Sequence, residues 1–268
     1  YSGTTYKTKF NENSDDNAYI GFMYGTPNSS TYAATHANTN KSTILQNLET
    51  WYKSKLTSYT DKLADTIWCN DKSTAKDTTI NTLNSSNGIL NKESIIIKGL
   101  GYKKENTYYV AGTRHFGFDQ GTTGYTYGTG PSLICPKDND GGKLSKFTVN
   151  DMVNGNGSLD YKIGLLTTDE MVLAGFSLVS VYFNNYDYYN KNSVTSYLSS
   201  NATSTKYWTL SPFALDSSAE CWVATSISFL SFDFYVNYSV GLRPAIALKS
   251  STTISGGNGT ASSPFIVN

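Results

Sequence analysis

The sequence predicts an α+β domain, in which helices pack on a small twisted antiparallel sheet and long irregular loops join the elements. Two segments have the apolar spacing of amphipathic helices, and many short apolar runs have the length of strands. The stretches between them are rich in Ser, Thr, Asn and Gly, which favour turns. No internal repeat of fixed period is evident, and 268 residues fit one large domain or two small ones.

Residues 1–17 are predicted to form an N-terminal arm or linker, because they are polar and charged with little periodicity. Residues 18–268 are then expected to form a single domain, in which residues 18–24 are the first strand. Residues 25–40 contain Gly, Pro, Ser, Thr and Asn, and are expected to be a loop.

The first helix is predicted to begin after Ser42, whose side chain is of the type that caps helices. Ile44, Leu48, Tyr52 and Leu56 follow at intervals of four residues, which places them in one apolar stripe. Such a stripe is typical of a helix that packs on a core.

A second helix is predicted to run from Thr167, which stands three residues before Glu170 in the spacing of a capping box, to Gly175. A buried strand at residues 163–166 leads into it. Asp169 and Glu170 also resemble the acid pair of a glycosidase. Carboxylates in the first turn of a helix are stabilised by its dipole, so a structural role is the preferred interpretation.

Further strands are predicted at residues 66–69, 94–98, 108–111, 147–149, 207–210, 222–224, 242–248 and 264–267. The strand at 207–210 is expected to stop at Ser211 and Pro212, since proline cannot donate to a strand ladder. Surface loops are expected at residues 70–91, 117–130 and 183–197.

The composition excludes several classes of partner. The chain has 21 basic and 21 acidic residues, so it lacks the positive charge that binds nucleic acid or anionic membranes. No apolar run approaches the length that spans a bilayer, and no direct membrane insertion is expected. The low share of charged residues and the abundance of Tyr, Ser, Thr, Asn and Gly are typical of secreted β-rich and adhesive proteins. Because the chain begins at Tyr1, the question of a preceding signal peptide or anchor stays open.

The cysteines are Cys69, Cys135 and Cys221, and their spacings fit no zinc motif. Two interpretations stay open. If the protein is exported, Cys69 and Cys135 form a disulfide and one thiol is left over. Otherwise all three are buried thiols.

No metal or cofactor site is predicted. His36 and His115 are far apart and lie in polar stretches, where a histidine is usually solvated rather than catalytic. Residues 138–142 offer oxygen ligands for Ca²⁺, but the twelfth position of that run is Val149 instead of the glutamate of an EF-hand. A polar turn is therefore the preferred interpretation.

Residues 221–238 mix Phe, Tyr, Ser, Asp and Asn in an order that breaks the alternation of a single strand. Aromatic residues supply rigid contact area and small polar residues supply adaptable hydrogen bonds, so the mixture is typical of a recognition surface. The candidate ligand-binding residues are Cys221, Thr225, Ser226, Ser228, Phe229, Ser231, Phe232, Asp233, Phe234, Tyr235, Asn237 and Tyr238.

This segment is flanked by YWTLSP at residues 207–212 and GLRPAIAL at residues 241–248, and it contains Trp222. In this combination the chain resembles C-type-lectin-fold variable proteins, in which a diversity-generating retroelement rewrites the segment before the G-[LF]-R-P motif. The resemblance covers residues 19–268, and the strings WYKSKL, CNDKS and GNGSLDYKIGLLTTDE are similar to a group of bacterial surface proteins of that fold. It implies a C-type lectin-like fold with a variable segment at residues 219–240.

The resemblance also implies that Trp208, Trp222 and Arg243 hold the backbone of the segment, and that Cys221 is an accidental product of diversification. Arg243 lies in an apolar run, where a buried guanidinium needs carbonyl or carboxylate acceptors. Its removal is expected to cost several kcal/mol, on the order of a broken buried pair.

The expected function is ligand binding by a bacterial or phage adhesin or receptor-binding protein. It would display a diversifiable Tyr/Ser/Phe/Asn-rich surface to a protein or glycan receptor, at the cell surface, outside the cell or on a virion. One alternative is a structural subunit of a pilus or virion, which the sequence does not separate from a binding role. A less favoured alternative is an oxidase of the formylglycine-generating kind, which needs a reactive cysteine pair, whereas Cys221 has no cysteine near it in sequence. Neither enzymatic activity nor a cofactor is therefore expected.

Overall fold

The structure, a computed structural model, describes residues 6–74, 79–83, 90–94, 107–114, 131–136, 146–150, 157–174, 177–178, 206–215, 218–224, 229–260 and 262–268. Among the sequence predictions, those for His115, for residues 138–142 and for the loops at 117–130 and 183–197 lie outside this part of the chain.

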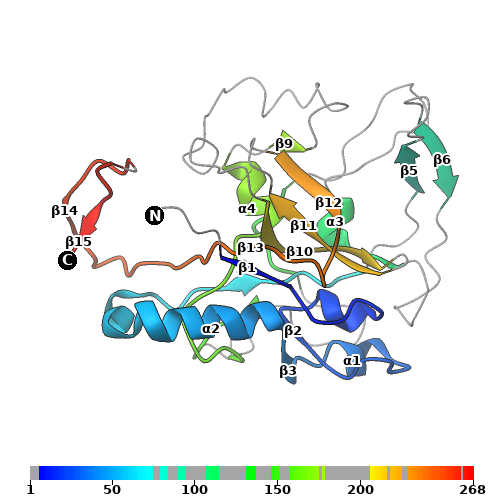
Figure 1. Cartoon of the computed structure of the whole chain (residues 1–268), viewed down its shortest axis with the longest axis horizontal. Coiled ribbons are helices and arrows are strands. Elements are labelled where there is room, and N and C mark those ends of the chain that lie inside the picture. Colours follow the sequence, from blue (N-terminus) through cyan, green and yellow to red (C-terminus); the bar gives the residue numbers. More distant parts are fainter. Residues whose placement is uncertain are drawn as a thin grey trace.

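The described chain is organised around one seven-stranded sheet (Figure 1). In spatial order it contains β1 (Lys7–Thr8), β13 (Val240–Gly241), β10 (Tyr207–Leu215), β11 (Ala219–Ala224), β12 (Phe229–Tyr235) and β9 (Ser177–Leu178), while β7 (Thr107–Tyr108) pairs with the end of β10. β10, β11 and β12 form an antiparallel meander, whereas β13 pairs with β10, and β9 with β12, in parallel. The sheet is therefore mixed rather than purely antiparallel, and together with the few helices it is compatible with the α+β class.

β10 is buried along its whole length, and each residue of its sequence YWTLSPFAL is buried. The prediction that Ser211 and Pro212 end this strand is wrong. The pairing with β11 shifts in register on both sides of Pro212. A proline has no N–H to donate, and a strand irregularity of this kind accommodates it.

The segment that the sequence indicates to be too irregular for one strand forms two paired strands, β11 and β12. Cys221 lies opposite Phe234 and Glu220 opposite Tyr235, and the register shifts between Cys221 and Val223. A shift of one residue exchanges the two faces of a strand, which explains why the alternation of apolar and polar residues slips in the sequence.

The first predicted helix is confirmed as α2 (Thr43–Lys55). The side chain of Ser42 caps it by accepting a hydrogen bond from the N–H of Leu45. Ile44, Leu48 and Tyr52 of the predicted stripe are buried, so this face of the helix packs on the core.

The second predicted helix is confirmed as α4 (Thr168–Leu173), which begins after a complete capping box. The side chain of Thr167 accepts a hydrogen bond from the N–H of Glu170, and Glu170 Oε2 accepts one from the N–H of Thr167 at 2.7 Å. Among the described residues no helix is both long enough and apolar enough to cross a bilayer.

The remaining described elements are short. The helical turns are η1 (Asn17–Ile20), α1 (Tyr32–Thr35), η2 (Thr57–Lys62) and α3 (Val110–Thr113). Two-stranded sheets pair β2 (Met23–Tyr24) with β3 (Asn40–Lys41), β4 (Trp68–Cys69) with β8 (Lys146–Phe147), β5 (Thr79–Leu83) with β6 (Leu90–Ser94), and β14 (Ile254–Gly256) with β15 (Ile266–Val267). The strand predicted at 18–24 is thus largely a helical turn, and part of the loop predicted at 70–91 is a hairpin.

Residues 1–17 were predicted to be an arm or linker, and within them Thr8 and Phe10 pack against the core. Phe10 is fully buried and its ring meets that of Trp208 edge-to-face, with 5.7 Å between the centroids. The indole N–H of Trp208 donates to the carbonyl of Thr8 at 2.9 Å. Phe10 stands in a polar run, where no apolar periodicity indicates its burial.

The polar residues after β4 are buried rather than exposed, which corrects the prediction of a surface loop from residue 70 onwards. The side-chain oxygen of Asn70 accepts from the N–H of Phe22 at 2.8 Å, and its amide donates to the carbonyl of Leu210 at 2.9 Å. The ammonium of Lys72 donates to Asn38 Oδ1 at 2.7 Å. Buried polar groups persist only with such partners.

The closing strand predicted at residues 242–248 is reduced to isolated bridges, which join Ala245 to Gly164 and Leu248 to Leu63. The final predicted strand is confirmed as β15. Figure 1 shows the β14–β15 hairpin at one side of the molecule, away from the large sheet.

Candidate functional site

The end of β12 and the turn that follows it carry a cluster of aromatic side chains. Phe234 and Tyr235 are half-buried, and Tyr238 is 47 % exposed. The ring of Tyr238 lies 6.4 Å from that of Phe234 and 5.1 Å from that of Tyr235, centroid to centroid. Lys206, which precedes β10, places its ammonium 4.1 Å from the centroid of Phe234. We call Lys206, Phe234, Tyr235, Asn237 and Tyr238 the aromatic surface.

The backbone under the aromatic surface is held by the core. Val236 is fully buried, and its N–H donates to the carbonyl of Ala219 at 2.9 Å. The carbonyl of Val236 accepts from the N–H groups of Phe10 and Asn11, at 2.8 and 3.0 Å. The rings on either side of Val236 are therefore presented from a fixed position rather than from a free loop.

The structure corrects the assignment of Cys221 to the ligand-binding surface. Its side chain is fully buried, and its Sγ approaches the carbonyl of Ile20 at 3.8 Å. Burial raises the pKa of this thiol well above its usual value, and Glu220 adds to the effect. A neutral, buried thiol neither contacts a ligand nor acts as a nucleophile.

The other candidate residues divide into groups. Phe234, Tyr235 and Tyr238 lie together on the aromatic surface, and Asn237 is half-buried in the turn between Tyr235 and Tyr238. The backbone of β12 contains Phe229, Ser231, Phe232 and Asp233. Thr225, Ser226 and Ser228 lie outside the described residues.

Trp208, Trp222 and Arg243, which were expected to hold the backbone of residues 219–240, differ in their burial and in their place in the sheet. Trp208 is 1 % exposed and packs in the core, as expected, and the backbone of Trp222 lies in β11. Arg243 was expected to be buried in a strand, but it is half-buried and lies outside the strands. Its guanidinium stands 4.1 Å from the ring centroid of Tyr207. Burial raises the pKa of Tyr207 above its usual value, and the charge of Arg243 opposes that shift.

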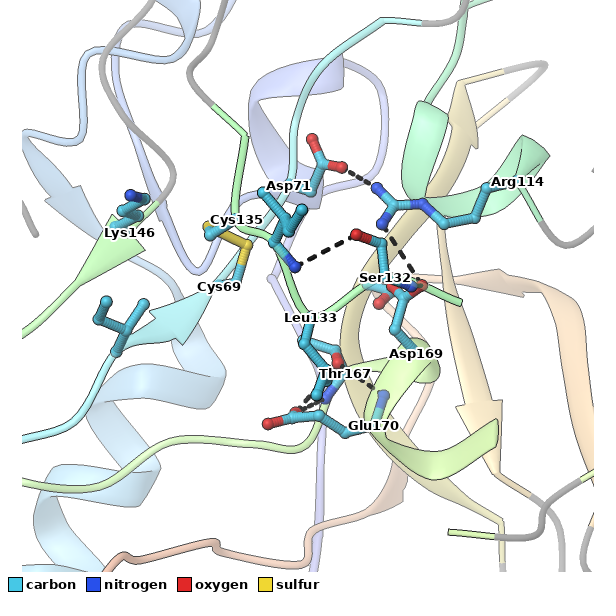
Figure 2. A pocket seen from close by; sticks show the side chains of 13 residues that line it. Cys69, Asp71, Arg114, Ser132, Leu133, Cys135, Lys146, Thr167, Asp169 and Glu170 are labelled. Carbon is cyan, nitrogen blue, oxygen red and sulfur yellow. Dashed lines mark hydrogen bonds and ion pairs between the residues drawn. A yellow bond between two sulfur atoms is a disulfide. The ribbon is translucent and has the colours of Figure 1, made fainter. Parts of the chain in front are cut away.

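A second region is a pocket of about 310 Å³ (Figure 2). Its walls come from β4, from the segment 131–136, from the start of α4 and from the end of α3. The lining residues are Ile67, Cys69, Asp71, Arg114, Ser132, Leu133, Ile134, Cys135, Lys146, Thr167, Asp169, Glu170 and Ser211. Because Arg114 is its central charged residue, we call it the Arg114 pocket.

Three buried charges form the floor of the Arg114 pocket. Figure 2 shows the guanidinium of Arg114 between the carboxyl groups of Asp71 and Asp169. Its Nη2 donates to Asp71 Oδ2, and its Nη1 donates to Asp169 Oδ1 at 3.3 Å. The side chains are each 6 % exposed. Burial raises the pKa of Asp71, although Arg114 opposes the shift.

The disulfide between Cys69 and Cys135 fixes one wall of this pocket, with 5.6 Å between the Cα atoms. Of the two interpretations that the sequence leaves open, the structure therefore shows the bridge. The backbone N–H of Ser132 also donates to Asp169 Oδ1 at 2.8 Å. Between these attachments Leu133 and Ile134 are 71 % and 79 % exposed at the rim of the pocket.

Sequence reasoning missed the Arg114 pocket, because its charged residues come from three separate segments. It treated Asp71 as part of a surface loop and Asp169 as a first-turn carboxylate. Asp169 and Glu170 do not act as an acid pair in this geometry. Asp169 is paired with Arg114, and Glu170 Oε2 is engaged in the capping box.

His36 is buried rather than solvated, which corrects the prediction for it. Its ring lies 4.3 Å from that of Tyr32, and burial together with the charge of Lys72 lowers its pKa well below the usual value. Among the described residues no group of three or more His, Cys, Asp and Glu side chains could hold a metal ion.

Neither a protein-family model, nor a curated protein, nor a solved structure matches the chain.

Proposed function

We propose that this chain is a ligand-binding module, an adhesin or receptor-binding protein of a bacterial cell or a phage, and not an enzyme. We propose further that it has a C-type lectin-like fold and that its aromatic surface contacts a protein receptor on another cell or surface. The observation that carries the proposal is the packing of Phe234, Tyr235 and Tyr238 beside Lys206.

The chemistry of the aromatic surface favours a protein partner. Aromatic residues dominate the energetic centres of protein interfaces, because they bury large areas and lose little side-chain entropy. A lysine beside an aromatic ring adds a charge that steers a partner without being buried. The anchoring of Val236 supports this proposal, since a preorganised surface binds without an ordering penalty.

The disulfide supports a location outside the cytoplasm. Structural disulfides persist in oxidising compartments, such as the periplasm, the medium and the surfaces of cells and virions. The Cys69–Cys135 bridge and the polar, Tyr-rich composition together favour the proposed extracellular, cell-surface or virion-surface location.

Receptor binding is tested by incubating fluorescently labelled chain with panels of intact bacterial and animal cells. The double variant Tyr235→Ser/Tyr238→Ser should reduce binding at least tenfold, because it removes the central rings. The matched control is Tyr59→Ser, which changes a 59 % exposed tyrosine elsewhere on the surface.

Treatment of the cells distinguishes the classes of receptor. Loss of binding after surface proteolysis supports a protein receptor, whereas loss only after periodate oxidation of cell-surface sugars would point to a glycan instead. Binding that the double variant and Tyr59→Ser affect equally, or no binding to any cell, would contradict the proposal.

We also propose that residues 219–240 are a segment open to diversification. Exposed substitutions usually change stability by no more than about 0.5 kcal/mol, whereas core truncations cost about 2–5 kcal/mol. Tyr238 is exposed and Phe234, Tyr235 and Asn237 are half-buried, so a library at these four positions should cost less stability than core truncation and should yield more folded protein than a core library. A library of the same size in the core should yield little; it covers Leu48, Leu165, Trp208 and Leu210, all buried.

Equal intolerance of the two libraries would refute the idea of a diversifiable face. A reverse-transcriptase gene and a near-copy of the segment beside the coding sequence are the genomic observation expected if diversification operates.

A structural subunit of a pilus or virion is the second candidate, and the C-terminal hairpin favours it. Ile254, Phe265 and Ile266 are 59 %, 55 % and 59 % exposed there, which is unusual for a hairpin that has no partner. Self-assembly of the purified chain that Phe265→Asp abolishes would favour this function.

A further inference from the structure

The Arg114 pocket shares no residue with the aromatic surface, so receptor binding as proposed leaves it without a role. Its floor is built from side chains that the fold holds in place. Arg114, Asp71 and Asp169 are almost fully buried and are fixed by one another, and Asp169 is fixed further by the N–H of Ser132. Their groups face a cavity of about 310 Å³.

The guanidinium of Arg114 has hydrogen-bonding capacity to spare. An arginine carries five N–H donors. Its Nε donates to the carbonyl of Val110 at 3.3 Å, and its Nη1 and Nη2 donate to Asp169 and Asp71. Two N–H groups of Arg114 are thus left without a partner among the described residues. Buried donors of this kind cost free energy unless a ligand or water accepts from them.

The charge of the floor argues against a charged ligand. An anion that approaches Arg114 also meets the carboxylates of Asp71 and Asp169, which lie within hydrogen-bonding distance of the guanidinium. The floor has two carboxylates and one guanidinium, so a cation is repelled less than an anion, but it still meets the guanidinium that lies between the carboxylates. In either case attraction is accompanied by like-charge repulsion in a poorly solvated site.

A hydroxyl group fits this floor, because it both accepts and donates. It accepts from a spare N–H of Arg114 and donates to a remaining lone pair of the Asp71 carboxylate. Hydrogen bonds of this kind to charged groups are stronger than those between neutral partners.

The rim adds apolar contact of limited extent. Ile67, Leu133 and Ile134 line the pocket and are exposed, and they offer surface for the C–H groups of a ring. Figure 2 shows Lys146 and Glu170 on different sides of the pocket, so opposite charges flank it. The volume lies at the lower end of the roughly 300–1,000 Å³ that is usual for ligand pockets, which limits the ligand to about one ring.

We propose that the Arg114 pocket binds one neutral, hydroxyl-rich ring, such as a hexose unit, through the spare N–H groups of Arg114 and the carboxylate of Asp71. This site is separate from the aromatic surface, and its existence does not depend on the proposed receptor binding.

The proposal is tested by ligand-observed NMR and calorimetry on the full chain with D-glucose, D-galactose, D-mannose and N-acetylglucosamine. Glucosamine and glucuronate serve as a matched cation and anion of the same ring size. We expect at least one neutral sugar to bind with a dissociation constant on the order of millimolar, which is the affinity that so small a ligand reaches. The two charged sugars should bind at least tenfold more weakly.

Two variants locate the binding. Arg114→Lys keeps the positive charge but lacks the fork of donors, and should weaken sugar binding at least tenfold. Ile134→Asp places a charge on an exposed position of the rim, where it should weaken binding without unfolding the protein. The matched control is Ile254→Asp, which changes an exposed isoleucine of the C-terminal hairpin and should leave binding unchanged.

Each outcome supports or overturns the proposal. Tight binding of a charged sugar only, no binding of any neutral sugar, or binding that Ile134→Asp leaves intact would overturn it. If Arg114→Lys does not fold, Ile134→Asp against Ile254→Asp decides the question. Sugar binding that Tyr235→Ser/Tyr238→Ser abolishes and Ile134→Asp does not would place the sugar on the aromatic surface instead.

Discussion

The aromatic surface and the Arg114 pocket are assembled from the chain in opposite ways. The rings of Phe234, Tyr235 and Tyr238 come from one short stretch, and only Lys206 joins them from another strand connection. The floor of the pocket combines Asp71, Arg114 and Asp169, which are separated by 43 and 55 residues in sequence. The first region is local and partly exposed, and the second is non-local and buried.

The two regions should therefore differ in how well they tolerate amino-acid substitutions. On the aromatic surface a side chain contacts its neighbours and solvent, while buried backbone such as that of Val236 holds the shape. In the pocket each charged side chain is held by the others, so the loss of one leaves a buried charge unpaired. Substitutions should therefore affect binding in the first region and stability in the second.

The largest expected effect is that of Arg114→Ala on the free energy of unfolding. Removing the guanidinium leaves two nearly buried carboxylates without their cation, and the loss of one partner of a buried pair costs about 3–5 kcal/mol. Urea unfolding followed by circular dichroism measures it. The matched control, Lys206→Ala, removes an exposed cation from the aromatic surface and should cost less than about 1 kcal/mol. Equal losses of unfolding free energy in the two variants would contradict the view that the pocket residues stabilise the fold and the aromatic surface does not.

The disulfide should contribute about 4 kcal/mol. Cys69 and Cys135 are 66 residues apart, and in the chain-entropy model a loop of this length restricts the unfolded state by that amount. Unfolding of the double variant Cys69→Ser/Cys135→Ser, compared with the unreduced protein, measures the contribution. Mass analysis of the native protein should find Cys221 as the free thiol. Three free thiols after purification under oxidising conditions would refute the bridge.

Reduction should also separate the two regions. The bridge attaches the segment 131–136, a wall of the pocket, whereas no residue of the aromatic surface takes part in it. Sugar binding should therefore weaken in the double cysteine variant, and receptor binding should persist. Loss of both would show that the two regions depend on a common scaffold more strongly than their geometry indicates.

A moderate effect is expected from acid on the buried His36. Its folded-state pKa lies well below the value of about 6.5 that it has when unfolded. Below pH 6.5 the unfolded chain therefore takes up a proton that the folded chain does not, and stability is lost as the pH falls. The loss begins near pH 6.5 and grows as the pH falls towards the folded-state pKa.

The contribution of His36 is isolated by comparing the native protein with His36→Phe, which keeps a ring between the tyrosines but does not titrate. The loss of unfolding free energy between pH 7 and pH 5 should be smaller in the variant, because a phenylalanine takes up no proton in either state. An identical pH dependence in both proteins would mean that the unfolded and folded states bind protons at this position alike.

The features that could be predicted from the sequence are those that depend on residues close to one another in the chain. Ser42 and the four-residue spacing after it predicted α2, and Thr167 with Glu170 predicted the capping box of α4. Both depend on contacts within one turn of the chain, so no tertiary information is needed. The aromatic composition of residues 221–238 is also visible in the sequence because it is continuous there, and its role as a binding surface stays a prediction.

The features that were missed depend on distant partners. In the sequence Asp71 has the features of a polar loop residue. Its pairing with Arg114 depends on the fold, which brings together residues 43 positions apart. The assignment of Cys221 to the ligand-binding surface failed because its burial depends on distant parts of the chain, such as the carbonyl of Ile20, which the neighbouring residues do not reveal. Phe10 was missed because one buried ring in a polar run has no period.

The smallest expected effect concerns Arg243, which the sequence predicted to be buried and the structure shows to be half-buried. As a buried guanidinium in a strand it would be worth several kcal/mol, but it is half-buried and stacked on Tyr207, where a cation–π contact contributes about 1 kcal/mol. Arg243→Ala should therefore lower the free energy of unfolding by about that amount, and Arg243→Lys by less.

The same variant should raise the pKa of Tyr207 further, because the charge of Arg243 opposes the rise that burial causes. Since the chain has 21 tyrosines, the titration of Tyr207 is obtained as the difference between each protein and its Tyr207→Phe counterpart. Tyr207 pairs with Gly241 of β13, next to the turn that carries Tyr238, so loosening this contact should also weaken receptor binding slightly. A loss of more than about 3 kcal/mol would restore the buried-pair interpretation, while no change in stability or in the pKa would show that Arg243 does not brace the aromatic surface.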